Sequence, residues 1–81
     1  MRSKKIFRKL LNDPAEMRFQ EVQNILAHCG YFLVRIRGSH HQFKNPQTEK
    51  LFTIPCHEMK VSRYYLRMLK EVVDQFQSNH L

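Results

Sequence analysis

The strongest constraint on the fold is the change of apolar spacing at Gly30, within the stretch "HCGYFLVRIRG". Before this glycine, four apolar residues recur at the spacing of one helix face: Phe19, Val22, Ile25 and Leu26. After it, side chains alternate in the way that suits a strand with one covered face. Glycine readily takes the left-handed backbone conformation that follows a helix end. The sequence therefore predicts a helix that stops at residue 30 and leads directly into a strand.

The other elements are short and of both kinds. Apolar residues at helical spacing predict a helix over residues 3–11 and a last helix that Ser62 can cap. The second helix starts either near Asp13, where Glu16 completes a capping-box pattern, or later in the chain. Three strands are expected between the second and the last helix: residues 31–37, 39–44 and 50–54.

Gly38 marks a turn or bulge after the first strand, and "NPQTE" marks a turn after the second. Such short connections predict an antiparallel sheet, with the helices covering one face. The expected fold class is therefore α+β, a two-layer sandwich with a three-stranded sheet. A chain of 81 residues has room for one core, so residues 1–81 are expected to form a single domain.

Charge favours a polyanionic partner, either a nucleic acid or an acidic protein. The chain carries 14 Lys and Arg against seven Asp and Glu, a formal net charge of +7. The first 12 residues contain five cations and no acid: Arg2, Lys4, Lys5, Arg8 and Lys9. This basic N-terminal extension, residues 1–12, fits either a contact with such a partner or a helix face exposed to solvent.

Other classes of function find little support in the sequence. No apolar run is long enough to cross a membrane, and the N-terminus lacks a signal-peptide pattern, so a cytoplasmic protein is expected. With only two glycines the chain has no phosphate-cradling loop, and no cofactor is expected. Cys29 and Cys56 stand in no metal or redox spacing; they are read as two reduced thiols, although the sequence alone also allows a disulfide.

Strand alternation separates the two adjacent histidines of "RIRGSHHQFK". Phe43 is the only large apolar residue of the second strand, so it fixes which side chains of that strand face the helices. His41 then points inward with it, while His40 points outward. The expected inner face consists of Phe32, Val34, Ile36, Phe43, Phe52 and Ile54. The expected outer face carries Arg35, Arg37, His40, Gln42, Lys44 and Thr53.

The outer face suits RNA cleavage. A hairpin around residues 45–48 places His40 opposite residues 53–55, which brings His57 within about 10 Å by ordinary cross-strand spacings. Histidine can take or give a proton near neutral pH, and cations can stabilise charge on a phosphate. The alternative is that both histidines are merely exposed.

Two other sites are weaker. The histidines and cysteines lack zinc-site spacing, so no metal site is expected, and a Cys–His nucleophilic pair lacks an orienting residue.

A set of short motifs resembles the HicA (YcfA-like) toxin family. These motifs are Gly30-Tyr31, then Gly38-Ser39-His40 with Phe43, then Pro55-Cys56-His57 ahead of the last helix. Their order and spacing extend over residues 17–76. Many family members start near residue 17, so the helix over residues 3–11 is additional.

The resemblance implies a fold like that of the double-stranded RNA-binding domain and an mRNA-cleaving toxin silenced by a HicB antitoxin. It places the family's functional histidine at His40. The expected function is thus a metal-independent endoribonuclease acting on mRNA, with His40 as general base and His57 as a candidate general acid. The residues expected to bind RNA are Arg35, Arg37, Gly38, Ser39, Lys44 and Lys50.

The alternative functions are a non-catalytic RNA-binding module and a protein-interaction domain whose basic face meets an acidic partner.

Overall fold

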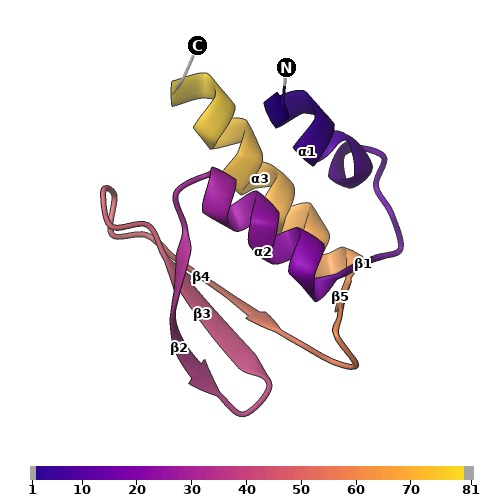
Figure 1. The fold of residues 1–81 in the computed structure, drawn as a ribbon, viewed down its shortest axis with the longest axis vertical. Coiled ribbons are helices and arrows are strands. Elements are labelled where there is room, and N and C mark those ends of the chain that lie inside the picture. The colour runs from indigo at the N-terminus through magenta and orange to yellow at the C-terminus, as the bar shows by residue number, and fades with distance from the viewer. Residues whose placement is uncertain (1, 80–81) are drawn as a thin grey trace.

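The structure of the chain is a computed structural model that describes residues 2–79. Three helices and five short strands follow one another along these residues (Figure 1). Their order is α1 (Arg2–Leu11), β1 (Glu16–Arg18), α2 (Phe19–His28), β2 (Phe32–Arg37), β3 (His40–Lys44), β4 (Leu51–Pro55), β5 (Lys60–Ser62) and α3 (Arg63–Asn79). The α+β class predicted from the sequence is confirmed, and so is the helix expected over residues 3–11.

Helix α2 ends at the predicted glycine. Gly30 has φ +89°, and its N–H donates to the carbonyl of Ala27 at 3.0 Å. The N–H of Tyr31 donates to the carbonyl of Leu26 at 2.8 Å. This pair of bonds is the Schellman motif, which satisfies carbonyls that a helix end leaves free. The left-handed conformation at residue 30 turns the chain out of α2 and into β2.

The start of α2 is the later of the two predicted positions. Arg18 is the N-cap residue, and its N–H donates to Oε1 of Glu21 at 3.2 Å. The capping box expected at Asp13 is wrong, because Asp13 has φ +53° and its carboxylate pairs with arginines of α3. Its oxygens lie 3.2 Å from Nη2 of Arg67 and 3.7 Å from Nε of Arg63.

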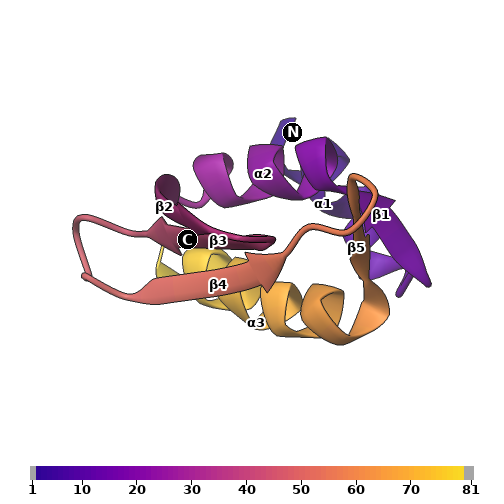
Figure 2. The same ribbon diagram turned by 90° about the horizontal axis from the view of Figure 1, so that it is seen from below.

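Strands β2, β3 and β4 form an antiparallel sheet in that order. Helices α2 and α3 lie side by side over one face of this sheet, and no helix of the described residues lies on the opposite face (Figures 1 and 2). The order of α2, three antiparallel strands and α3 is consistent with a fold like that of the double-stranded RNA-binding domain. The predicted three-stranded sheet with helices over one face is therefore confirmed.

The core lies between the sheet and the helices, but β2 contributes no side chain to it. Phe43, Phe52 and Ile54 are buried, as predicted. Phe32, Val34 and Ile36 are exposed at 54%, 56% and 57%, so their predicted place in the core is wrong. Val34 forms a bulge that shifts the register between Leu33 and Arg35, and β2 is an edge strand. The resulting register sets Phe32 opposite Lys44, on the face of the sheet that has no helices. On the other face, α2 and α3 do not extend over β2.

A second, two-stranded sheet pairs β1 with β5, with Met17 opposite Val61 and both side chains buried. The sequence predicts no strand at residues 60–62, because a strand of only three residues holds too little pattern to show a period. Strand β1 directly precedes α2, and β5 directly precedes α3. Their pairing therefore joins the starts of these two helices (Figure 2).

Helix α1 packs on the other two helices and not on the large sheet (Figure 1). Its residues Phe7 and Leu10 are completely buried. The ring of Phe7 meets those of His28 and Phe76 edge-on, with centroids 5.5 and 6.4 Å away. Helix α1 is therefore a third layer that covers the helices on the side away from the sheet. None of the helices within residues 2–79 is long and apolar enough to cross a membrane.

Candidate functional site

The open face of the sheet is built from three cross-strand rows. The β3 residues that point away from the buried Phe43 are His40, Gln42 and Lys44, and each has one partner on β2 and one on β4. The rows are Arg37–His40–Pro55, Arg35–Gln42–Thr53 and Phe32–Lys44–Leu51. Residues paired across an antiparallel ladder share a face and lie about 5 Å apart. We call these nine positions the open face; they include four cationic or titratable nitrogen groups and no carboxylate.

His40 stands at the end of this face that borders the β2–β3 turn. It is exposed, and the register pairs it directly with Arg37 on one side and Pro55 on the other. The outward position of His40, and its placement opposite residues 53–55, are as predicted from strand alternation. A cationic side chain directly beside an exposed imidazole is an arrangement that can bind a phosphate next to a proton acceptor.

His41 points the other way and is half-buried. Its ring centroid lies 4.7 Å from that of Phe19, the first residue of α2. Its Nδ1 is 3.0 Å from the carbonyl oxygen of Ser39, which can only accept, so Nδ1 carries the proton. The predicted division of the two histidines, one outward and one packed inward, is confirmed.

The β2–β3 turn is linked to the segment that carries His57. Gly38 has φ +61° and open space around its Cα, and the carbonyl of Ser39 accepts a hydrogen bond from the N–H of Cys56 at 2.8 Å. The same carbonyl contacts His41, so it joins two strands at one point. His57 follows Cys56 directly and is exposed. The backbone thus brings the segment of His57 to the end of the open face where His40 lies.

His57 opens a tight turn that holds backbone strain. Its N–H donates to the carbonyl of Lys60 at 3.3 Å, and the N–H of Lys60 donates back at 2.9 Å. The two central residues, Glu58 and Met59, have φ of +52° and +64°. Positive φ at both central positions is the pattern of the type I′ hairpin turn, which favours Asn and Gly. The turn is held against α2, because the carbonyl of Met59 accepts the N–H of Phe19 at 2.8 Å.

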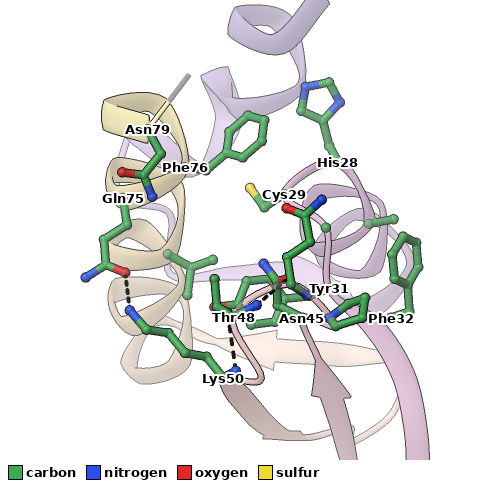
Figure 3. A pocket seen from close by; sticks show the side chains of 15 residues that line it. His28, Cys29, Tyr31, Phe32, Asn45, Thr48, Lys50, Gln75, Phe76 and Asn79 are labelled. Carbon is green, nitrogen blue, oxygen red and sulfur yellow. Dashed lines mark hydrogen bonds between the residues drawn. The ribbon is translucent and has the colours of Figure 1, made fainter. Parts of the chain in front are cut away.

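The predicted RNA-binding cations do not all lie together. Arg35 and Arg37 are exposed on the open face, and Lys44 is half-buried in its third row. Lys50 instead turns toward α3, where its Nζ donates to Oε1 of Gln75 at 3.0 Å (Figure 3). It lies at the end of the β3–β4 hairpin that is far from His40. The structure therefore groups three of the four predicted cations on one face.

A cavity of about 540 Å³ opens at that far end, between the end of α2, the β3–β4 turn and α3 (Figure 3). Its wall includes Cys29, Asn45, Lys50 and Gln75. Burial raises the pKa of the Cys29 thiol to about 11, so this group stays protonated and unreactive near neutral pH. The cavity therefore offers no activated nucleophile.

Neither cysteine forms a disulfide, which agrees with their reading as two reduced thiols. Among residues 2–79 no group of three or more His, Cys, Asp or Glu side chains could hold a metal ion. His40 is placed beside Arg37 on a face without carboxylates, whereas His57 pairs with Lys60.

Two features of the site were missed from the sequence. Phe32 and Leu51 occupy the third row of the open face and are exposed at 54% and 55%. The strained turn at Glu58 and Met59 was also missed, because neither residue is a usual turn former. The alternation of "EKLFTI" placed Phe52 inward and could have indicated Leu51 as outward.

Comparison with known proteins identifies one family. The family model described as the HicA toxin of bacterial toxin–antitoxin systems matches residues 19–74, which lie within the 17–76 segment expected from the motifs. No curated protein and no solved structure matches the chain. The matched segment covers α2, the whole three-stranded sheet and most of α3, and it includes His40, His57 and the open face. Since it also spans more than half of the 81 residues, the chain belongs to the HicA toxin family of bacterial toxin–antitoxin systems.

Proposed function

We propose that this toxin is an endoribonuclease that cleaves mRNA without a metal ion, with His40 as general base, and that a HicB-like antitoxin silences it. The observation that carries the proposal is the row Arg37–His40–Pro55 on a face that has cations and no carboxylate. Arginine binds phosphate in a bidentate manner. A divalent cation would find no carboxylate ligand among the nine positions of this face.

In the proposed reaction, Nε2 or Nδ1 of His40 takes the proton of a ribose 2′-hydroxyl. The 2′-oxygen attacks the adjacent phosphorus, a new O–P bond forms, and the bond from phosphorus to the 5′-oxygen of the next nucleotide breaks. Arg37 and Arg35 stabilise the negative charge that builds on the phosphate oxygens. His57 is assigned the transfer of a proton to the leaving 5′-oxygen, since its segment is tied to the β2–β3 turn.

The other expected RNA contacts follow the same face. Lys44 continues the line of cations away from His40, and the backbone of Gly38 and Ser39 borders the proposed scissile phosphate. Lys50 is assigned a minor role, because its bond to Gln75 directs it toward α3. Single-stranded RNA fits this face better than a duplex, since Arg35 and Arg37 lie two residues apart on β2, about 7 Å by ordinary strand geometry, and can follow one phosphate chain.

The test is cleavage of a single-stranded RNA by purified wild type and by His40→Gln, with His28→Gln as the matched control. His28 is an exposed histidine on the helical layer, away from the open face. We expect His40→Gln to lose at least about 100-fold in rate, the range of general-base catalysis, while His28→Gln keeps its activity. The products should carry 2′,3′-cyclic phosphate ends, EDTA should not inhibit, and RNA with a 2′-deoxy residue at the cleavage position should resist. Magnesium-dependent products with 5′-phosphate ends would refute the mechanism.

The fold itself favours one alternative, a non-catalytic RNA-binding module, because its element order matches that of a domain that binds RNA without cutting it. The same assay separates the two. If wild type binds the RNA but never cleaves it, and His40→Gln binds equally well, the module is the correct function.

A further inference from the structure

Strand β2 leaves an apolar edge uncovered. Four of its six residues are apolar and the other two are arginines, so the strand carries no acid and no uncharged polar residue. All six residues are exposed, and Phe32, Val34 and Ile36 are each more than half exposed. The opposite edge strand, β4, buries Phe52 and Ile54. The difference shows that exposure of β2 is not a general property of edges in this small domain.

An exposed edge strand with aliphatic side chains is a template for pairing with another strand. Its outer backbone N–H and C=O groups lack a neighbouring strand among residues 2–79, where β2 pairs only with β3. A nucleic acid cannot form the regular ladder of backbone hydrogen bonds, and it would not bury the aliphatic side chains of Leu33, Val34 and Ile36. A protein strand can form these hydrogen bonds and can cover these side chains.

Charge decides which protein strand fits. Arg35 and Arg37 lie within β2, and no carboxylate lies on that strand or on the open face beside it. If a second copy paired with β2, four arginines would meet within one short ladder, and like charges on neighbouring strands are destabilising. A strand with carboxylates alternating with aliphatic residues would pair its acids with the arginines and cover the apolar side chains.

We propose that the free edge of β2 is the docking strand for an acidic β-strand of a partner protein, which extends the sheet by one strand. Neighbouring strands lie about 4.8 Å apart, so the added strand would lie about 10 Å from β3 and would not occupy the position of His40. It would instead neutralise Arg35 and Arg37. The consequence that such a partner inhibits RNA cleavage rests on the proposed function, whereas the docking itself does not.

The test uses a fluorescent peptide of alternating glutamate and valine as the probe, with anisotropy as the readout. The double variant V34K/I36K places lysines on the β2 edge, where they oppose strand addition. The matched control L11K/M68K adds the same two charges at apolar residues of α1 and α3 that are exposed at 46% and 41%. Added lysines alone would strengthen binding of an acidic peptide, so a loss of binding at the edge isolates the strand pairing.

We expect V34K/I36K to weaken the peptide by at least about tenfold, and L11K/M68K to bind as well as wild type or better. A peptide with N-methyl groups at alternate backbone nitrogens should bind weakly, and a peptide with lysine in place of glutamate should not bind. Hydrogen exchange should slow at the amides of residues 32–37 when the glutamate peptide is added.

Equal binding of the N-methylated peptide, or of V34K/I36K and wild type, would overturn the proposal. If V34K/I36K instead weakens a single-stranded RNA bound to the His40→Gln protein, the edge belongs to the RNA path and the proposal is wrong. Circular dichroism of each variant confirms that the sheet is formed before any result is read. None of these outcomes depends on whether wild type cleaves RNA.

Discussion

Replacement of Phe7 by alanine tests whether α1 is part of the fold or an added RNA-binding arm. Helix α1 lies outside the segment that matches the HicA family, residues 19–74, and it carries most of the N-terminal positive charge. In the structure Phe7 is completely buried and its ring contacts those of His28 and Phe76. The geometry therefore assigns α1 to the core, and Phe7→Ala should destabilise the whole domain.

The size of the effect follows from burial. Loss of a fully buried phenylalanine costs about 3–5 kcal/mol, the sum of lost transfer free energy and the cavity left behind. A domain of 81 residues has a total free energy of unfolding of roughly 4–12 kcal/mol. At about 4–8 °C per kcal/mol for a domain of this size, Tm should fall by about 12 °C or more.

The assay is urea unfolding followed by circular dichroism, with Leu11→Ala as the control in the same helix. Leu11 is 46% exposed, so its truncation should cost less than about 1 kcal/mol. A cost below 1 kcal/mol for Phe7→Ala would refute the assignment of α1 to the core.

A second variant separates the charge of α1 from its packing. Lys5 and Arg8 are exposed on the layer farthest from the sheet (Figure 1). Lys9 is already paired with Glu21, with 3.1 Å between Nζ and Oε2. We expect Lys5→Ala with Arg8→Ala to leave RNA binding at the open face within about twofold, since α2 and α3 lie between α1 and the sheet and salt screens exposed charges that are far from the bound phosphates. A large loss of RNA affinity would show that the RNA wraps around the helical layer.

Three further predictions concern the turn, an ion pair and the open face. The double variant Glu58→Asn/Met59→Gly should raise the free energy of unfolding in urea by about 1–2 kcal/mol, because both new residues accept positive φ. An unchanged free energy of unfolding would contradict the inferred strain in this turn. A hydrogen bond from Arg67 of α3 lowers the pKa of Asp13 from its ordinary value of 3.8. The ionised carboxylate therefore stabilises the fold above pH 3.8, and this contribution disappears as the pH falls through the lowered pKa of the folded state. Asp13→Asn should therefore lower Tm at pH 7 and converge with wild type in acid, and equal Tm values at pH 7 would show that the pair contributes nothing. If the three cations of the open face each neutralise one phosphate, the salt dependence of binding should have a slope of about −2.1, and replacement of Arg35 and Arg37 by glutamine should reduce its magnitude by about 1.4.

The sequence predicted the elements with strong periodicity and the direction of the two histidines. Apolar residues at helical spacing located α1, α2 and α3, and the single large apolar residue Phe43 set the direction of every side chain on β3. That one residue was sufficient because a strand has a period of two, so one buried position determines its neighbours. His40 could be distinguished from His41 for this reason alone.

Strands β1 and β5 could not be predicted, because three residues hold too little pattern to show a period. Their pairing depends on contacts far apart in the sequence, such as Met17 with Val61. The turn that joins His57 to β5 gave no signal either, since Glu58 and Met59 have no preference for positive φ. Its conformation is imposed by the surrounding hydrogen bonds, including that from Phe19 to Met59.

The failure at β2 differs in kind, and it bears on function. The alternation of "FLVRIR" correctly indicated a strand, but the inference that Phe32, Val34 and Ile36 lie in the core assumed that helices cover the whole sheet. Local sequence carries no information on how far two helices extend over a sheet, so an edge with apolar residues looks the same whether the domain or a partner covers it. Positions where predictions from local sequence patterns fail are often functional sites. A chain of this family has a partner antitoxin. The strand pairing proposed above would let such a partner cover the exposed apolar residues of β2 beside Arg35 and Arg37.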